Sequence, residues 1–142
     1  MPLKVRPLAL GLIGAICGCT GLVAGPETNA VTPVPASRDS AYARTRRALA
    51  AESFTLDVVD SLDGHITGRR YNRPTARLGT AEICRVGIVL DIRGDGGTAE
   101  LATQSRWLAP ASMADQAPEI CEEARAVVLD RIRVTVAPPT TP

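Results

Sequence analysis

Two neighbouring stretches of alternating residues constrain the fold of this chain most strongly. Over residues 82–92, one face of an extended chain holds five apolar residues: Cys84, Val86, Ile88, Leu90 and Ile92. Residues 98–107 alternate similarly and end on Trp107, and a glycine-rich loop at 93–97 joins the two stretches. Because successive side chains of a strand point to opposite faces of a sheet, the pattern predicts an antiparallel pair of strands with one buried face.

The segment before this pair predicts a helix followed by a strand. Residues 41–52 contain neither glycine nor proline, and Tyr42, Thr45 and Leu49 recur on one side of a helix. The apolar spacing then changes to two over residues 54–60, which is typical of a half-buried strand.

The remaining elements complete an α+β fold. An Asp63-Gly64 turn leads into a returning strand over residues 66–71, and Pro118 lies in the first turn of a second helix. The apolar stripe expected on that helix consists of Ile120, Ala124, Val127 and Val128. The period alone leaves open whether residues 132–136 are a further strand. The sequence thus predicts an antiparallel sheet of four or five strands with two helices packed on one face.

The composition fits one small domain without a large excess of either charge. The chain has 142 residues, and 16 lysines and arginines against 15 acidic residues leave a formal charge of +1. Aromatic residues make up only 3%, so we expect neither a base-stacking surface nor a nucleic-acid partner. We expect a signal peptide at 1–18, a proline-rich flexible linker at 19–38, one domain at 39–136 and a disordered tail at 137–142.

The N-terminus is typical of an exported lipoprotein. A short cationic start precedes an apolar run at residues 8–16, which is too short to span a bilayer. The residues that follow, Ile16-Cys17-Gly18-Cys19, resemble the lipobox of bacterial lipoproteins, with Cys19 as the modified cysteine.

The lipobox resemblance implies a membrane anchor. It implies a diacylglycerol on the Cys19 sulfur, cleavage before this residue and a further acyl chain such as palmitate on the new amino group. Thr20 follows the cysteine, which favours the outer membrane, with the domain facing the periplasm. The alternative is an ordinary secretory signal cleaved near Ala24, which leaves a secreted protein without an anchor.

The other two cysteines, Cys84 and Cys121, predict a disulfide. Export exposes them to an oxidising compartment, and a last helix packed on the apolar strand face brings them together. The alternative is two buried free thiols that pack as small hydrophobic groups. Two thiols and one histidine at unrelated spacings do not form a tetrahedral metal set, so we expect no metal and no cofactor.

The candidate contact residues are basic. Arg69, Arg70, Arg73 and Arg77 form a local cluster on the returning strand and the loop after it. Such a cluster is either a solvated surface or a contact for an acidic partner, lipid headgroups or anionic cell-wall polymers. The single histidine, His65, follows the predicted turn, and the sequence places no nucleophile or carboxylate against it, so we expect no catalytic residue.

A second resemblance concerns the first half of the predicted domain. Residues 47–52 end a helix, residues 54–58 begin a strand with an aromatic, residues 63–64 are an Asp-Gly turn and residues 66–67 an Ile-Thr return. This order is similar to the helix-grip domains of accessory lipoproteins in the outer-membrane β-barrel assembly machinery, which carry a glycine where Ser53 stands here. The resemblance implies a non-catalytic, lipid-anchored binding or scaffolding protein with an envelope protein partner. The alternatives are a small secreted or envelope hydrolase and an unanchored secreted inhibitor or antigen.

Overall fold

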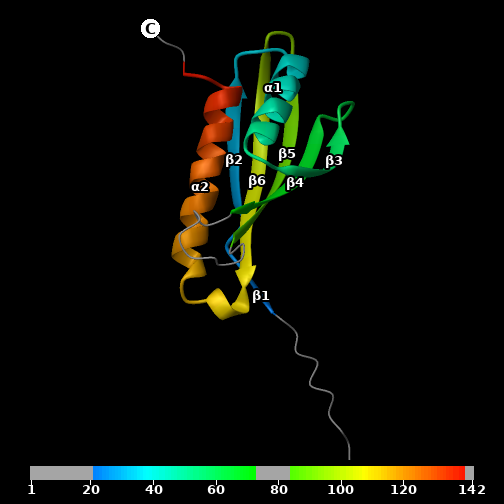
Figure 1. The fold of residues 1–142 in the computed structure, drawn as a ribbon. Coiled ribbons are helices and arrows are strands. Elements are labelled where there is room, and N and C mark those ends of the chain that lie inside the picture. The colour runs from blue at the N-terminus through cyan, green and yellow to red at the C-terminus, as the bar shows by residue number, and fades with distance from the viewer. Residues whose placement is uncertain (1–20, 73–83, 140–142) are drawn as a thin grey trace, which may run out of the picture.

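The computed structural model describes residues 21–72 and 84–139, which form one sheet and two long helices (Figure 1). The elements follow one another as β1 (Leu22–Ala24), β2 (Thr28–Val34), α1 (Arg38–Ala51), β3 (Thr55–Asp60), β4 (His65–Asn72), β5 (Cys84–Asp95), β6 (Thr98–Pro110), the short 3-10 helix η1 (Ala111–Met113) and α2 (Ala117–Val136). The predicted signal peptide, Cys19, Arg73 and Arg77 lie outside the described residues. Within those residues, no helix has the length and apolar character needed to cross a membrane.

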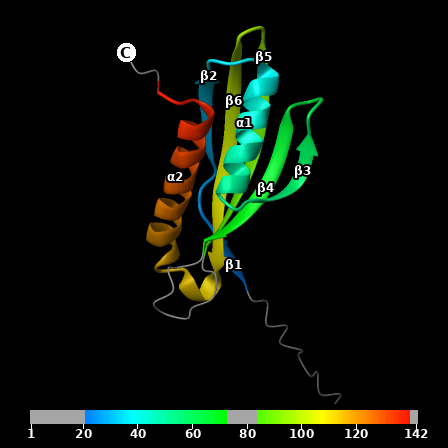
Figure 2. The ribbon, with the colours of Figure 1, turned by 45° about the horizontal axis from the view of Figure 1, so that its top comes forward.

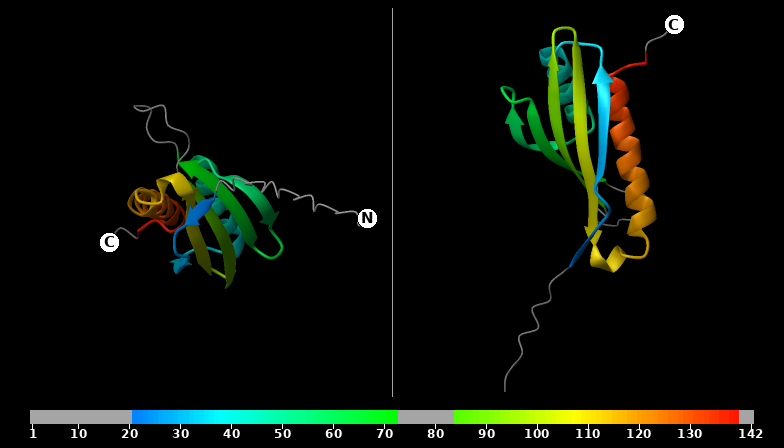
Figure 3. Two further views of the ribbon diagram at one scale, coloured as in Figure 1. Left: turned by 90° about the horizontal axis from the view of Figure 1, so that it is seen from below. Right: turned by 180° about the vertical axis from the view of Figure 1, so that it is seen from behind.

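The strands form a single antiparallel sheet. Their order is β1-β6-β5-β4-β3, and β2 also pairs with β6, alongside β1. β3 is an edge strand and carries a register shift between Leu56 and Val58. α1 and α2 lie side by side on one face of the sheet, and the other face is open in the described part (Figures 1 and 2; Figure 3, right). The predicted α+β class with two helices on one face is confirmed, with six strands instead of four or five.

The two additional strands lie in the segment predicted as a flexible linker, residues 19–38. β2 pairs with β6 over all seven of its residues and buries Val34 to 1% exposure. The linker prediction is wrong because a proline does not exclude an edge strand, and Pro33 lies in such a strand here. Between β1 and β2 the chain passes very close to Trp107: a Cβ on Gly25 would lie 2.1 Å from the indole nitrogen, so glycine is required.

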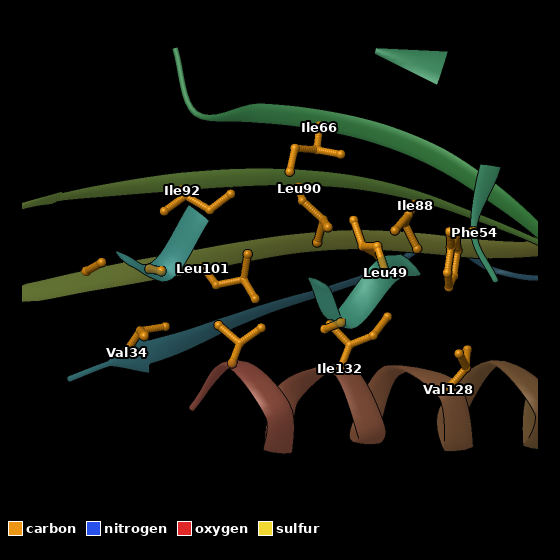
Figure 4. Packing of buried hydrophobic residues seen from close by; sticks show 14 of the residues in the cluster. Val34, Leu49, Phe54, Ile66, Ile88, Leu90, Ile92, Leu101, Val128 and Ile132 are labelled. Atoms are coloured by element: carbon orange, nitrogen blue, oxygen red, sulfur yellow. The ribbon is translucent and has the colours of Figure 1, made fainter. Parts of the chain in front are cut away.

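The core lies between the inner face of the sheet and the two helices (Figure 4). The five alternating residues of β5 are all buried, as the sequence predicts: Cys84, Val86, Ile88, Leu90 and Ile92. All of these except Cys84 belong to the main cluster, in which Leu49 of α1 and Val128 and Ile132 of α2 also pack. Trp107, at 3% exposure, belongs to a second and smaller cluster that also contains Cys121.

The helix α1 and the turn after it have identifiable local causes. The side chain of Ser37 caps the helix by accepting a hydrogen bond from the backbone N–H of Ser40 at 3.3 Å. After the helix, Ser53 has a φ of 60°, in the left-handed region that favours glycine. A serine in this conformation has a steric cost that a glycine would not have.

The helix α2 continues to Val136, so residues 132–136 are helical and do not form a strand. Its buried side consists of Ala117, Cys121, Arg125, Val128, Ile132 and Val136. Two residues of the expected stripe, Ile120 and Val127, are instead 40% and 44% exposed. The expected stripe is misplaced because Arg125 stands in the buried row, and an arginine in a sequence is normally assigned to the solvent side.

The pairing of β2 predicts that a substitution at Val34 has a large effect on stability. We expect Val34→Ala to lower the free energy of unfolding by about 1–3 kcal/mol, because it empties space in a closed core. Val31→Ala is the matched control, since Val31 lies in the same strand but is 65% exposed. Its effect should stay within about 0.5 kcal/mol. Urea unfolding measures both variants, and equal effects would contradict the placement of β2.

The backbone of Ser53 predicts a stabilising substitution. We expect Ser53→Gly to raise the free energy of unfolding by up to about 1 kcal/mol, because glycine adopts a positive φ without steric cost. The larger backbone entropy that glycine loses on folding limits this gain. Ser61→Gly, in the exposed turn after β3, is the control and should leave stability unchanged or lower it. Thermal unfolding followed by circular dichroism compares the two. A loss of stability in Ser53→Gly would show that the serine is not strained.

Candidate functional site

The open face of the sheet brings together three arginines from three neighbouring strands. In the register of β4, β5 and β6, Arg69 lies opposite Gly87, and Gly87 lies opposite Arg106. Arg85 lies two residues before Gly87 and therefore on the same face. All three arginines line a hollow over Gly87, which has no side chain to fill it. We call Arg69, Arg85 and Arg106 the arginine patch.

The hollow in the arginine patch is shallow, open and positively charged. It encloses about 350 Å³. Asp57 of β3 forms an ion pair with Arg69, with 3.0 Å between Oδ1 and Nη1, and Glu27 also lines the hollow. The hollow thus has three guanidinium groups and two carboxylates, and one of the carboxylates already pairs with Arg69. Because positive charge is in excess, the hollow can accept a further anion.

One arginine of the patch is held in place by an aromatic side chain. The Arg85 guanidinium lies 5.0 Å from the centre of the Tyr71 ring, and its Nε donates a hydrogen bond to the Tyr71 hydroxyl at 3.0 Å. The two residues are also cross-strand neighbours in β4 and β5. A cation–π contact and a hydrogen bond together restrict the Arg85 side chain, which lowers the entropy lost when it binds an anion.

The structure separates two arginines that the sequence groups together. Arg69 lies on the open face, whereas Arg70 points to the helix side, where its Nη1 lies 3.3 Å from Oε2 of Glu52. Arg131 of α2 lies 3.7 Å from the same oxygen. Successive residues of a strand face opposite sides, so Arg69 and Arg70 do not share one contact surface.

Two members of the patch are absent from the candidates chosen from the sequence. Arg85 and Arg106 are remote from Arg69 along the chain, so they do not belong to its local charge cluster. The alternation of β5 and β6 already places each of them on the polar side of its strand. The missing information is the register that brings those polar sides into one row.

The histidine forms a pair on the same open face, away from the hollow. His65 Nδ1 lies 2.7 Å from Oδ1 of Asp91, its neighbour across β4 and β5, and both side chains are about one-third exposed. The turn before it requires glycine at position 64. Gly64 has a φ of 71°, and a Cβ added there would lie 2.4 Å from the carbonyl oxygen of Ile92. The His65–Asp91 pair is a cross-strand contact that also holds the imidazole in one orientation.

The disulfide lies where α2 crosses the sheet. Cys84 of β5 and Cys121 of α2 are bonded, with their Cα atoms 5.4 Å apart. One turn further along α2, the buried Arg125 donates from Nη1 to the hydroxyl of Ser105 at 3.0 Å and also bonds to the hydroxyl of Thr28. A covalent bond and a polar network therefore both attach α2 to the sheet.

The same network includes one carboxylate with a shifted pKa. Glu122 accepts hydrogen bonds at 3.2 Å from Nε of Arg125 and from Nε1 of Trp107. The hydrogen bonds and charge of Arg125, assisted by the indole N–H of Trp107, hold the pKa of Glu122 below its usual value, and partial burial opposes them. The arrangement is a structural anchor for the helix. Across the described ranges, no three His, Cys, Asp or Glu side chains are grouped as metal ligands.

Comparisons with known proteins concern the fold. No protein-family model and no curated protein matches the sequence. Among solved structures, the chain is similar to Ara h 8.0201, with a TM-score of 0.53 and 10% identity over 82% of this chain and 98% of that one. It is also similar to norcoclaurine synthase from Thalictrum flavum in complex with dopamine and hydroxybenzaldehyde (TM-score 0.47, 11% identity, 93% and 95% covered). The likeness to Ara h 8.0201 shows a helix-grip fold, which confirms that part of the sequence resemblance.

The pKa of Glu122 predicts a pH-dependent effect of one substitution. A carboxyl whose pKa is lowered on folding stabilises the fold above its unfolded value of about 4.5, and this contribution is lost as the pH falls through the folded pKa. We therefore expect Glu122→Gln to reduce the urea midpoint at neutral pH and to approach the wild-type midpoint in acid. Glu123→Gln, at an exposed position next to it, is the control and should follow the wild type at every pH. A gap between Glu122→Gln and the wild type that is independent of pH would contradict this role.

Proposed function

We propose that this chain is a lipid-anchored binding protein of the cell envelope, without bond-making chemistry, that holds an acidic envelope component on the open face of its sheet. The observation that carries the proposal is the arginine patch, in which three strands place Arg69, Arg85 and Arg106 around one hollow. The lipobox-like sequence that ends at Cys19 supports the anchored location.

The chemistry of the patch favours binding over catalysis. A guanidinium group stays protonated throughout the physiological pH range, so it does not act as a general acid or base near neutrality. Its planar set of donors instead matches carboxylate and phosphate oxygens. The hollow over Gly87 is open and shallow, which suits an anionic group that belongs to a larger molecule.

The hydrolase alternative rests on the pair of His65 and Asp91. A carboxylate that orients an imidazole occurs in general-base catalysis, but this chemistry also requires a nucleophile within hydrogen-bond reach of the free ring nitrogen. Within the described residues, the ring of His65 is hydrogen-bonded to Asp91, and no hydroxyl is hydrogen-bonded to its other nitrogen. We therefore favour a structural role for this pair and a binding role for the face.

The anchor predicts different behaviour for two neighbouring cysteines. Cys19→Ala should abolish acylation and release the protein from the membrane fraction, because lipid attachment requires the sulfur of this residue. Cys17→Ala, two residues earlier, should leave acylation and membrane location unchanged. Intact-mass analysis and cell fractionation test both variants. A mature chain that begins near Ala24 and carries no acyl mass would instead support the secreted alternative.

The binding surface is tested by photocrosslinking on the same anchored protein. A crosslinker in place of Gln104, which lines the hollow, should form an adduct with an envelope component. The adduct should disappear when the three arginines of the patch are changed to glutamine. A crosslinker in place of Glu123, exposed on α2, is the control. Equal labelling from both positions would refute the assignment of binding to the open face.

A further inference from the structure

The position of β1 limits how far the domain lies from a lipid on Cys19, if the proposed anchor is correct. The carbonyl of Gly21 accepts a hydrogen bond from the N–H of Ala111 at 2.8 Å, and Leu22 pairs with Pro110. Only two peptide units separate Cys19 from Gly21, which allows at most about 7.6 Å between their Cα atoms. The end of the sheet that carries β1 and η1 therefore lies directly at the membrane surface.

The open face at this end has the residues of a membrane interface. Leu22 is 64% exposed at the start of β1, and Tyr71 is 42% exposed at the end of β4. Tyr71 ends a row of residues that runs across four paired strands from β1 to β4. The row consists of Ala24, Leu108, Arg85 and Tyr71. Tyrosine and arginine are favoured where an apolar layer meets phosphate groups, and leucine is favoured in the apolar layer itself.

The arginine patch begins in that same row. Arg85 belongs to this row. Arg69 and Arg106 come two residues before Tyr71 and Leu108, which places them about 7 Å farther from the end that carries β1, at the usual rise per residue. From the lipid-bearing end outward, the open face thus presents an exposed leucine, then a tyrosine with an arginine, then two more arginines. This order matches the change from acyl chains to headgroup phosphates.

Charge on the other side of this end selects the face that contacts the membrane. Asp115 lies just before α2, and Glu119 and Glu123 are exposed in its first turns. Anionic headgroups repel these carboxylates and attract the arginines on the opposite side of the sheet. Glu27 and Asp57 reduce the positive charge of the patch without reversing it.

We propose that the lipid-bearing end of the open face rests on the membrane, with Leu22 and Tyr71 at its interface and the arginine patch bound to the phosphate groups of anionic lipid headgroups. The proposal deepens the proposed function, because it names lipid as the acidic component. It also assigns a role to the exposed Tyr71 at the membrane interface, because the anchor alone does not explain its exposure.

The depth of Tyr71 tests this orientation. Acylated protein, verified by intact mass, is reconstituted into phosphatidylglycerol vesicles with brominated acyl chains, which quench nearby tryptophan. Tyr71→Trp should lose much more fluorescence than the wild type, whose buried Trp107 is present in every variant. Leu62→Trp is the control, because Leu62 is 87% exposed in the turn between β3 and β4, at the far end of β4. Equal quenching of the two added tryptophans would overturn the proposal.

The lipid charge tests the role of the arginines. Changing Arg69, Arg85 and Arg106 to glutamine in Tyr71→Trp should reduce its quenching in phosphatidylglycerol vesicles and have little effect in phosphatidylcholine vesicles. Changing Arg46, Arg47 and Arg93 to glutamine removes the same charge elsewhere and should have no effect. If the arginine changes leave the quenching in phosphatidylglycerol vesicles unaltered, while the wild type without vesicles binds inorganic phosphate through these arginines, the patch is a site for free phosphate, and the proposed lipid contact is wrong.

Failure of this inference is distinguishable from failure of the proposed function. An acylated chain that crosslinks to an envelope protein through position 104, without selective quenching at position 71, retains the binding function and overturns the lipid contact. A chain without acyl groups overturns both.

Discussion

The pairing of β5 with β6 is the interaction on which the rest of the structure depends. These are the two longest strands, with 12 and 13 residues, and every other part of the sheet is built outward from them. The same register that directs Ile88 and Leu101 into the core directs Arg85 and Arg106 to the open face. A shift of one residue would exchange the two sides, so the core and the arginine patch cannot vary independently.

The spacing of apolar residues is sufficient to predict the strand around Leu90 and the buried side of α1. The alternation around Leu90 predicts a strand with one buried face, and the spacing of Thr45 and Leu49 predicts the buried side of α1. The bond between Cys84 and Cys121 agrees with the prediction made from the expected export and the apolar side of β5. For this strand and this helix, each residue's own neighbours contain the information that determines its environment.

Properties that depend on distant pairing are not predictable in this way. Val34 becomes a core residue only because β6 offers a free edge to β2, and its proline-rich surroundings indicate a linker when they are considered alone. Arg125 occupies the buried row of α2 because Ser105, Thr28 and Glu122 satisfy its donors. The arginine patch depends on two strand registers at once. A single sequence contains no direct measure of such registers.

The open edges of the sheet have a consequence for neighbouring molecules. In the proposed orientation, all copies in one membrane are oriented alike relative to the membrane surface. Lateral diffusion then repeatedly brings the β2 edge of one copy to the β3 edge of another. Unprotected edges would join such copies into continuous sheets. Pro33 lacks the N–H that pairing along β2 requires, and the register shift in β3 distorts its edge. These two irregularities favour separate molecules even where the surface is crowded.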